Sequence, residues 1–190
     1  MKPSSIVRVL VASLVYLAVY PLASSSGLIH PACYAYAGTV TPLLFAFVYL
    51  YASANMQCFG AAAIPNGVLL VIGLVTGEGG LGFVVIIIAL TAIAEVIRAL
   101  CGYSTLKGVR LSFIPFAFSF YAYSAHWWTD TAGSLAAAVA EMPAGYADTM
   151  APVIDNTPML VVMLILVIPV ALLAIRLAEK VLKKQAAELE

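Results

Sequence analysis

Long apolar stretches alternate with short polar connections along this chain, and their spacing predicts its elements. A helix needs roughly 20 apolar residues to cross a bilayer. Six stretches approach or exceed that length, at about residues 6–23, 31–54, 58–76, 81–100, 109–128 and 157–182. The pattern therefore predicts an all-α membrane protein, with six transmembrane helices in one compact bundle that forms a single domain over residues 1–190.

The connection between the fifth and sixth stretches is the longest polar segment and has helical character. Residues 134–141 read Ser-Leu-Ala-Ala-Ala-Val-Ala-Glu, which favours a helix, with Thr131 or Ser134 as its N-cap. We expect a short outer-face helix within about residues 131–150. It either covers the mouth of the bundle as a lid or rests at the lipid interface.

Composition supports the membrane assignment. Of 190 residues, 64% are apolar and 9% are charged, with a mean hydropathy of +1.05, whereas soluble domains carry about 25% charged residues. The net charge of zero, without a basic patch, excludes a nucleic-acid partner. The three cysteines fall on both sides of the predicted bundle, so no structural disulfide is expected: Cys33, Cys58 and Cys101.

The basic residues predict the orientation of the bundle. All nine fall in three short stretches: Lys2 and Arg8; Arg98, Lys107 and Arg110; and Arg176, Lys180, Lys183 and Lys184. Six spans with both termini inside place every one in the cytoplasm, as the positive-inside rule requires. Reading residues 1–26 as a cleaved secretory signal would leave five spans and break this charge distribution.

Two polar positions fall inside the apolar stretches. Glu95 precedes Arg98 by one helical turn, a spacing that predicts a local ion pair; a transport role is the alternative, because ionisable groups in membranes are often functional. Asn66 follows Pro65. Its side chain either reaches into the bundle toward a ligand or satisfies the carbonyl that the proline frees.

The richest group of candidate binding residues lies at the outer end of the fifth stretch. His126 and Asp130 are four residues apart, on one face of a helix. Their side chains would bind a polar group of a ligand while indole rings stack on the ligand. The alternative is that these aromatic residues form a belt at the membrane interface. The candidates are Tyr123, His126, Trp127, Trp128 and Asp130.

Other polar residues fall at the same outer level, in the connections between the stretches. Together they would form a polar rim over an apolar pocket. They are His30, Glu78, Asp155 and Asn156.

Enzyme signatures are missing from the sequence. There is no phosphate-binding loop, no pair of histidines spaced on a helix for a metal, and no Gly-x-Ser-x-Gly elbow. We therefore expect no enzyme activity, no catalytic cofactor and no metal site in this chain.

A resemblance to a known family rests on the middle of the chain. A Gly-rich turn at residues 77–80 is followed by Ala94-Glu95-Val96-Ile97-Arg98-Ala-Leu-Cys-Gly102-Tyr103, by Lys107 and by an aromatic fifth stretch. From about residue 56 to the basic tail, the chain resembles the substrate-binding S components of energy-coupling factor (ECF) importers, in the subgroup called Trep-Strep or MptD-like.

The resemblance implies a function and partners. The protein would capture a vitamin-like or other micronutrient from the outer face of the inner (cytoplasmic) membrane of a prokaryote. It would work with a membrane scaffold (T) subunit and two cytoplasmic ATPases, which use the ATP. The binding pocket would lie under the outer loops, where His30, Glu78 and residues 126–130 are found.

The resemblance also suggests where partners would dock. S components carry an Ala-x-x-x-Ala face on the first span, whereas here Ala12 is followed by Tyr16. Basic residues on the inner face, including Arg98 and Arg110, would meet a partner or lipid headgroups. The turn at residues 76–80 lacks the His and Trp of the subgroup, which indicates a different substrate.

The expected ligand is a neutral or cationic aromatic ring, since the outer side carries acidic and aromatic residues but no basic ones. Haem is a further option, with His126 or His30 as the axial ligand. Two other functions are consistent with the sequence. One is an independent secondary transporter, and the other is a non-catalytic membrane scaffold or an intramembrane enzyme.

Overall fold

The computed structural model describes residues 3–78 and 80–189, and every regular element in these ranges is a helix. The α-helices are α1 (Pro3–Ser25), α2 (Pro31–Ala35), α3 (Pro42–Asn55), α4 (Ala63–Thr76), α5 (Leu81–Cys101), α6 (Leu106–Ala117), α7 (Ser119–Tyr123), α8 (His126–Thr129), α9 (Thr131–Glu141), α10 (Tyr146–Ile154), α11 (Thr157–Val181) and α12 (Lys183–Ala187). Two 3-10 turns, η1 (Ser26–Leu28) and η2 (Ala37–Thr39), connect them. The predicted all-α class is confirmed.

Three helical segments in the described ranges are long and apolar enough to cross a membrane: Ser4–Leu28, Leu81–Cys101 and Thr157–Val181. α3 and α4 are apolar but shorter, at 14 residues each. Large apolar side chains point outward along the bundle, with Val75 79% and Leu100 81% exposed. Such side chains need an apolar surrounding, which a bilayer supplies.

The predicted stretches 31–54 and 109–128 are each broken into several helices, and the stretch 58–76 holds one helix that covers only part of it. Pro42 begins α3 and Pro115 lies two residues before the end of α6. Proline has no N–H to donate, so a helix that contains one lacks a backbone hydrogen bond there. The second stretch divides into α2, η2 and α3, the helix of the third begins only at Ala63, and the fifth divides into α6, α7 and α8.

The connection between the fifth and sixth stretches contains two helices, whereas one was expected. α9 ends at Glu141, and α10 begins after Gly145, whose φ of 82° is accessible mainly to glycine. The N-cap of α9 is Asp130, whose carboxylate accepts a hydrogen bond from the Gly133 N–H at 3.2 Å. The expected caps, Thr131 and Ser134, do not have this role.

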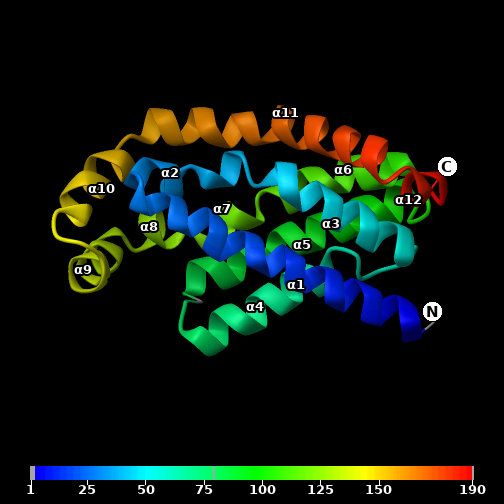
Figure 1. The fold of residues 1–190 in the computed structure, drawn as a ribbon, viewed down its shortest axis with the longest axis horizontal. Coiled ribbons are helices and arrows are strands. Elements are labelled where there is room, and N and C mark those ends of the chain that lie inside the picture. Colours follow the sequence, from blue (N-terminus) through cyan, green and yellow to red (C-terminus); the bar gives the residue numbers. More distant parts are fainter. Residues whose placement is uncertain (1–2, 79, 190) are drawn as a thin grey trace.

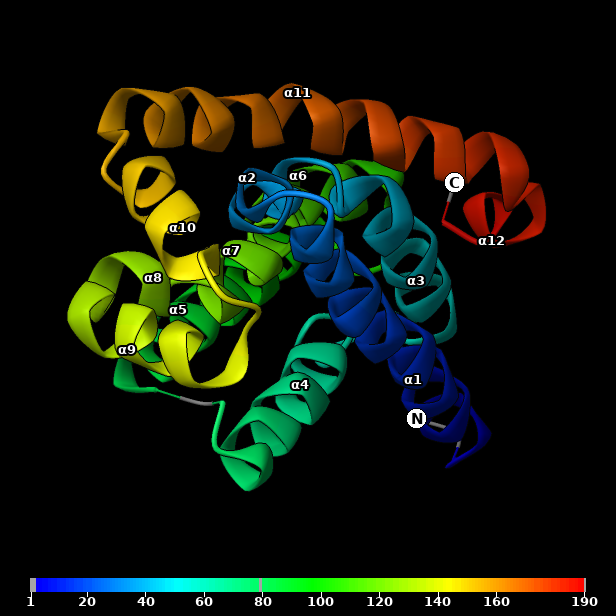
Figure 2. The same ribbon diagram turned by 60° about the vertical axis from the view of Figure 1, so that its left-hand side comes forward.

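The two ends of the bundle differ in character (Figure 1). Both termini and α12 lie at one end, whereas α8, α9 and α10 gather at the other. α11 runs along one side over the whole length, and α4 lies on the far side against α1 and α5 (Figure 2). Aromatic rings fill the centre; Tyr16, Phe45 and Phe116 are fully buried and in contact.

Contacts confirm that the three basic stretches share one end of the bundle. Arg8 donates to the Asn55 side chain at the end of α3, at 3.2 Å. The Leu106 N–H donates to the Leu189 carbonyl at 3.0 Å, which joins the start of α6 to the C-terminal tail. We call this the basic end, and the end formed by α8, α9 and α10 the opposite end.

Candidate ligand-binding site

Five aromatic side chains pack together inside the opposite end. The outer aromatic cluster consists of Tyr20 from α1, Tyr34 from α2, Phe120 and Tyr123 from α7 and Trp127 from α8. Phe120, Tyr123 and Trp127 are spaced three and four residues apart, so a helical path brings them to one face. Tyr20 stacks on Phe120 with ring centroids 5.5 Å apart, and Tyr34 meets Trp127 edge-on at 6.1 Å.

The polar tips of this cluster converge near the end of α1. The Tyr34 hydroxyl is within hydrogen-bonding reach of the Ser24 and Trp127 side chains, and the Tyr123 hydroxyl is within reach of Ser24. Ser24 Oγ and Trp127 Nε1 are buried away from water. Because buried polar groups are normally paired, these tips form a polar contact between α1, α2, α7 and α8.

α10 covers the cluster. Tyr146 is 8% exposed, and its hydroxyl is likewise buried without a hydrogen-bond partner among the described residues. It lies over Gly27, where a Cβ would come within 2.9 Å of the Tyr146 hydroxyl and 3.0 Å of Tyr34 Cβ. The Tyr36 hydroxyl donates to the Val153 carbonyl at 2.9 Å and holds the far end of α10. Gly27 thus permits the close approach that places Tyr146 above the cluster.

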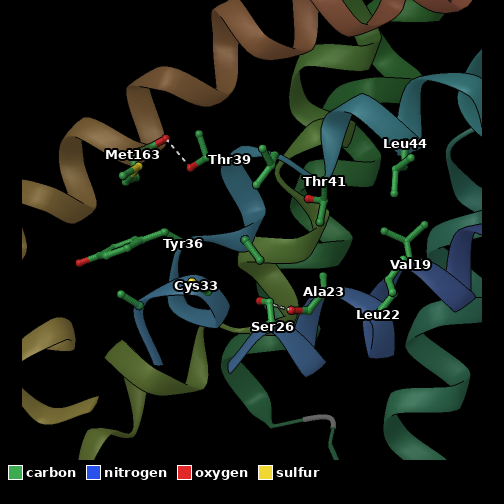
Figure 3. A pocket seen from close by; sticks show the side chains of 13 residues that line it. Val19, Leu22, Ala23, Ser26, Cys33, Tyr36, Thr39, Thr41, Leu44 and Met163 are labelled. Atoms are coloured by element: carbon green, nitrogen blue, oxygen red, sulfur yellow. Dashed lines mark hydrogen bonds between the residues drawn. The ribbon is translucent and has the colours of Figure 1, made fainter. Parts of the chain in front are cut away.

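A groove of about 680 Å³ opens elsewhere, between α1, the α2–α3 segment and α11 (Figure 3). Leu22 and Val40 on its wall are 64% and 58% exposed, so it opens on the apolar side of the bundle. Its hydroxyls are already bonded. Ser26 donates to the Ala23 carbonyl at 2.6 Å, and Thr39 is bonded to the Tyr121 hydroxyl and the Met163 carbonyl. Because its hydroxyls are bonded within the chain and its other lining side chains are mostly apolar, the groove is suited to alkyl chains.

None of the ten predicted binding residues lines that groove. Tyr123 and Trp127 belong to the outer aromatic cluster. Trp128 lies outside it, against Tyr121 with ring centroids 6.4 Å apart. His126 packs on Trp127, and its Nδ1 is hydrogen-bonded to the Ser134 hydroxyl at 2.9 Å. The chain turns after Thr129, so His126 and Asp130 do not continue along one helix as the spacing predicted.

Three other predicted residues cap helices. His30 Nδ1 accepts from the Ala32 N–H at 3.1 Å, and Asn156 accepts from the Met159 N–H at 3.1 Å, while Asp130 caps α9. All three are exposed, as are Glu78 and Asp155. The structure gives these residues no common cavity. Within the described ranges, no group of three His, Cys, Asp or Glu side chains has a metal-binding arrangement.

Asn66 lies deep in the bundle, below the cluster, and joins four helices. Its Oδ1 accepts hydrogen bonds from the hydroxyls of Tyr16 at 2.7 Å and Ser119 at 3.2 Å, and its Nδ2 donates to Thr91 Oγ1 at 2.8 Å. The Tyr16 hydroxyl is also bonded to that of Tyr20 in the cluster, at 2.6 Å. Asn66 therefore reaches inward, and polar contacts connect it to the outer aromatic cluster.

The predicted ion pair between Glu95 and Arg98 is wrong. Glu95 Oε1 accepts from the backbone N–H groups of Gly60, Ala62 and Ala63 at 3.0, 2.8 and 3.1 Å, so the carboxylate caps the start of α4 from α5. The Arg98 guanidinium donates to the carbonyls of Met56 and Tyr103. These N–H and carbonyl groups lie in loops next to α5 and outcompete the partner one turn away, because buried backbone groups must be satisfied.

Two of the four predicted partner-contact residues are inaccessible. Tyr16 and Arg98 are fully buried, so neither can touch a partner in this conformation. Ala12 lines a separate groove of about 440 Å³ between α1 and α3, near the basic end. Arg110 forms a bidentate ion pair with Glu179, at 2.8 and 2.7 Å, which joins α6 to α11. Cys33 and Cys101 form no disulfide among the described residues.

Sequence reasoning missed Tyr20 and Tyr34, which are the cluster members from the first half of the chain, and also Ser24 and Tyr146, which lie next to the cluster. The Tyr16–Tyr20 spacing marks an aromatic helix face. Nothing in the sequence, however, shows that this face meets residues about a hundred positions later.

Comparison with known protein families identifies this chain as a membrane protein. Residues 4–187 match the family described as hypothetical bacterial integral membrane protein (Trep_Strep). The match begins well before residue 56, where the resemblance in the sequence started. Searches of curated proteins and of solved structures found no match.

Proposed function

The chain belongs to the Trep_Strep family of bacterial integral membrane proteins, and from this premise we propose that it is the substrate-binding S component of an ATP-driven ECF importer. The observation that carries the proposal is the family match over residues 4–187, in a chain whose segment at residues 94–103 resembles the S components of such importers. A small molecule would be captured at the end of the bundle formed by α8, α9 and α10.

The proposed arrangement in the membrane follows from the two ends of the bundle. The three long helices, together with the α2–α3, α4 and α6–α7 segments, make six passages. The basic end, with both termini and the α5–α6 connection, lies in the cytoplasm. The cluster then lies near the outer face of the cytoplasmic membrane, under α9 and α10. This placement suits uptake from outside the cell.

Movement of the ligand would be driven by partners. The sequence has no phosphate-binding loop, so ATP would be used by two cytoplasmic ATPases that act through a membrane scaffold subunit. We place the scaffold contact at the α1–α3 groove around Ala12, where Val11 and Val15 are 58% and 59% exposed. Tyr16 has no part in it, because its ring points into the core.

The proposal predicts the composition of the native complex. The tagged chain, purified in mild detergent from membranes of its own bacterium, is expected to carry one scaffold subunit and two ATPases with phosphate-binding loops, identified by peptide mass fingerprinting. Ala12→Trp fills the α1–α3 groove and is expected to reduce scaffold recovery at least tenfold. Val85→Trp, on the exposed side of α5, is the matched control and should leave recovery unchanged. Purification of the wild-type chain without scaffold or ATPases would reject the proposal.

A further inference from the structure

We propose that a crevice between α4 and α5 binds a phospholipid whose headgroup carries a free ammonium group, with one acyl chain lying along the crevice. The α4–α5 crevice has a volume of about 310 Å³ and is lined by Glu95 toward the basic end and by Leu70 and Ile87 farther along. The inference goes beyond the proposed function, because it requires only that the chain lies in a membrane, as its family does.

Glu95 supplies the polar group of the crevice. Its Oε1 is taken by the N–H groups at the start of α4, whereas its Oε2 is buried and has no hydrogen-bond partner in the described part of the chain. Arg98, one turn away, donates to the carbonyls of Met56 and Tyr103, and no ion pair joins it to Glu95 among the described residues. A carboxylate accepts but cannot donate, so an occupant that satisfies Oε2 must bring a donor, and a positively charged donor binds most strongly.

The other polar side chains of the crevice are bonded to one another. Thr91 Oγ1 donates to the Ile87 carbonyl at 2.6 Å and accepts from Asn66 Nδ2 at 2.8 Å. Thr91 and Glu95 lie one turn apart on the same face of α5, and beyond Thr91 the lining is apolar. The crevice therefore offers an unpartnered carboxylate oxygen at one end and apolar surface along the rest. A lipid has the same division between its headgroup and its chains.

The crevice has room for a chain and opens toward the bilayer. A Cβ added to Gly67, in its wall, would meet no atom of the described residues within 4 Å apart from its immediate neighbours and its own helix backbone. Phe59, Ile88 and Ala92 at its rim are exposed. From Glu95 to Ile87, α5 rises by about 12 Å, which is most of the roughly 15 Å of hydrocarbon in one leaflet. One acyl chain of a lipid whose headgroup lies at Glu95 matches this length.

Three lipids with identical palmitoyl and oleoyl chains test the selectivity. Phosphatidylethanolamine carries an ammonium group with N–H donors, phosphatidylcholine carries an ammonium group whose hydrogens are replaced by methyl groups, and phosphatidylglycerol carries no ammonium group. Each is titrated into the delipidated chain in detergent, and bound lipid is counted by native mass spectrometry. We expect phosphatidylethanolamine to bind at least fivefold more tightly than both other lipids. Free ethanolamine, which has no chain, should not displace it.

Two substitutions test the two parts of the crevice separately. Gly67→Leu fills the apolar part without touching Glu95 and is expected to weaken binding of phosphatidylethanolamine at least fivefold. Gly80→Leu is the matched control: a Cβ there also meets no described atom within 4 Å, but Gly80 lies before α5 at the opposite end of that helix. Its binding should stay within twofold of wild type. Circular dichroism melting curves establish that both variants are folded.

Glu95→Gln tests the carboxylate. The amide oxygen still accepts from the start of α4, and the amide nitrogen then replaces Oε2 by a donor. The preference for phosphatidylethanolamine over phosphatidylglycerol is expected to fall to within twofold, while Gly67→Leu weakens both lipids.

Four results would overturn the inference. They are wild-type binding that does not distinguish the three lipids, equal losses in Gly67→Leu and Gly80→Leu, an unchanged preference in Glu95→Gln, and displacement of the lipid by free ethanolamine. A dimer mass without lipid adducts would also overturn it, because it would assign the crevice to a second copy of the chain. None of these results depends on recovery of the scaffold and ATPases, so the proposed function stands or falls separately.

Discussion

Replacing Glu95 by Ala is expected to lower the free energy of unfolding by roughly 3–5 kcal/mol, because three buried backbone N–H groups lose their acceptor at once. These N–H groups belong to the loop before α4 and to its first residue, and Glu95 is only 3% exposed. Unfolding in mixed micelles with increasing denaturing detergent, followed by circular dichroism, measures the change. The start of α4 should fray first.

The matched control is Glu95→Gln, which keeps an oxygen at the same distance from the three N–H groups. It should cost less than half as much as Glu95→Ala, because an amide oxygen still accepts although it carries no full charge. Wild-type stability of Glu95→Ala would show that the carboxylate does not hold α4 to α5.

Asn66→Ala is expected to destabilise the fold by about 2–4 kcal/mol, since it leaves Tyr16, Ser119 and Thr91 without their shared partner. The same unfolding measurement applies. Asn55→Ala is the matched control: this half-buried residue bonds Arg8 and the Tyr51 carbonyl at the basic end, and its loss should cost under about 1 kcal/mol.

A double-mutant cycle sharpens this prediction. Tyr16→Phe removes only the hydroxyl that donates to Asn66. Because the two side chains share one hydrogen bond, their effects should combine to less than the sum, by about 0.5–3 kcal/mol. Simple additivity would mean that the polar contact contributes nothing to the junction of α1 and α4.

The fold was predictable where apolar runs are unbroken. α1, α5 and α11 lie within a few residues of their predicted ranges, because length and hydropathy alone define such helices. The breaks at Pro42 and Phe118 were not predicted. A proline in an apolar stretch either kinks a helix or ends it, and the choice depends on how neighbouring helices satisfy the freed backbone groups. Those neighbours are not visible in the sequence.

Site prediction succeeded where the residues that meet in the structure also lie close together in the sequence. The aromatic run at residues 120–130 was recognised, and two of its candidates, Tyr123 and Trp127, do lie in the outer aromatic cluster. His30, Asp130 and Asn156 stood out because they are polar, yet polar residues next to helices are often caps. Glu95 was misjudged for the same reason. Its spacing to Arg98 fits an ion pair, but its carboxylate accepts hydrogen bonds from the backbone N–H groups of Gly60, Ala62 and Ala63 instead.

The central claim is that this chain captures a ligand and that partner ATPases drive its release. Native mass spectrometry of the complex, purified in lipid nanodiscs and recorded before and after addition of ATP, tests it most directly. The account predicts a complex of this chain, one scaffold and two ATPases that retains one small molecule, and loss of that molecule only after ATP is added. Two results would contradict the account. One is a chain that appears without partners, and the other is an assembled complex that retains the ligand equally with and without ATP.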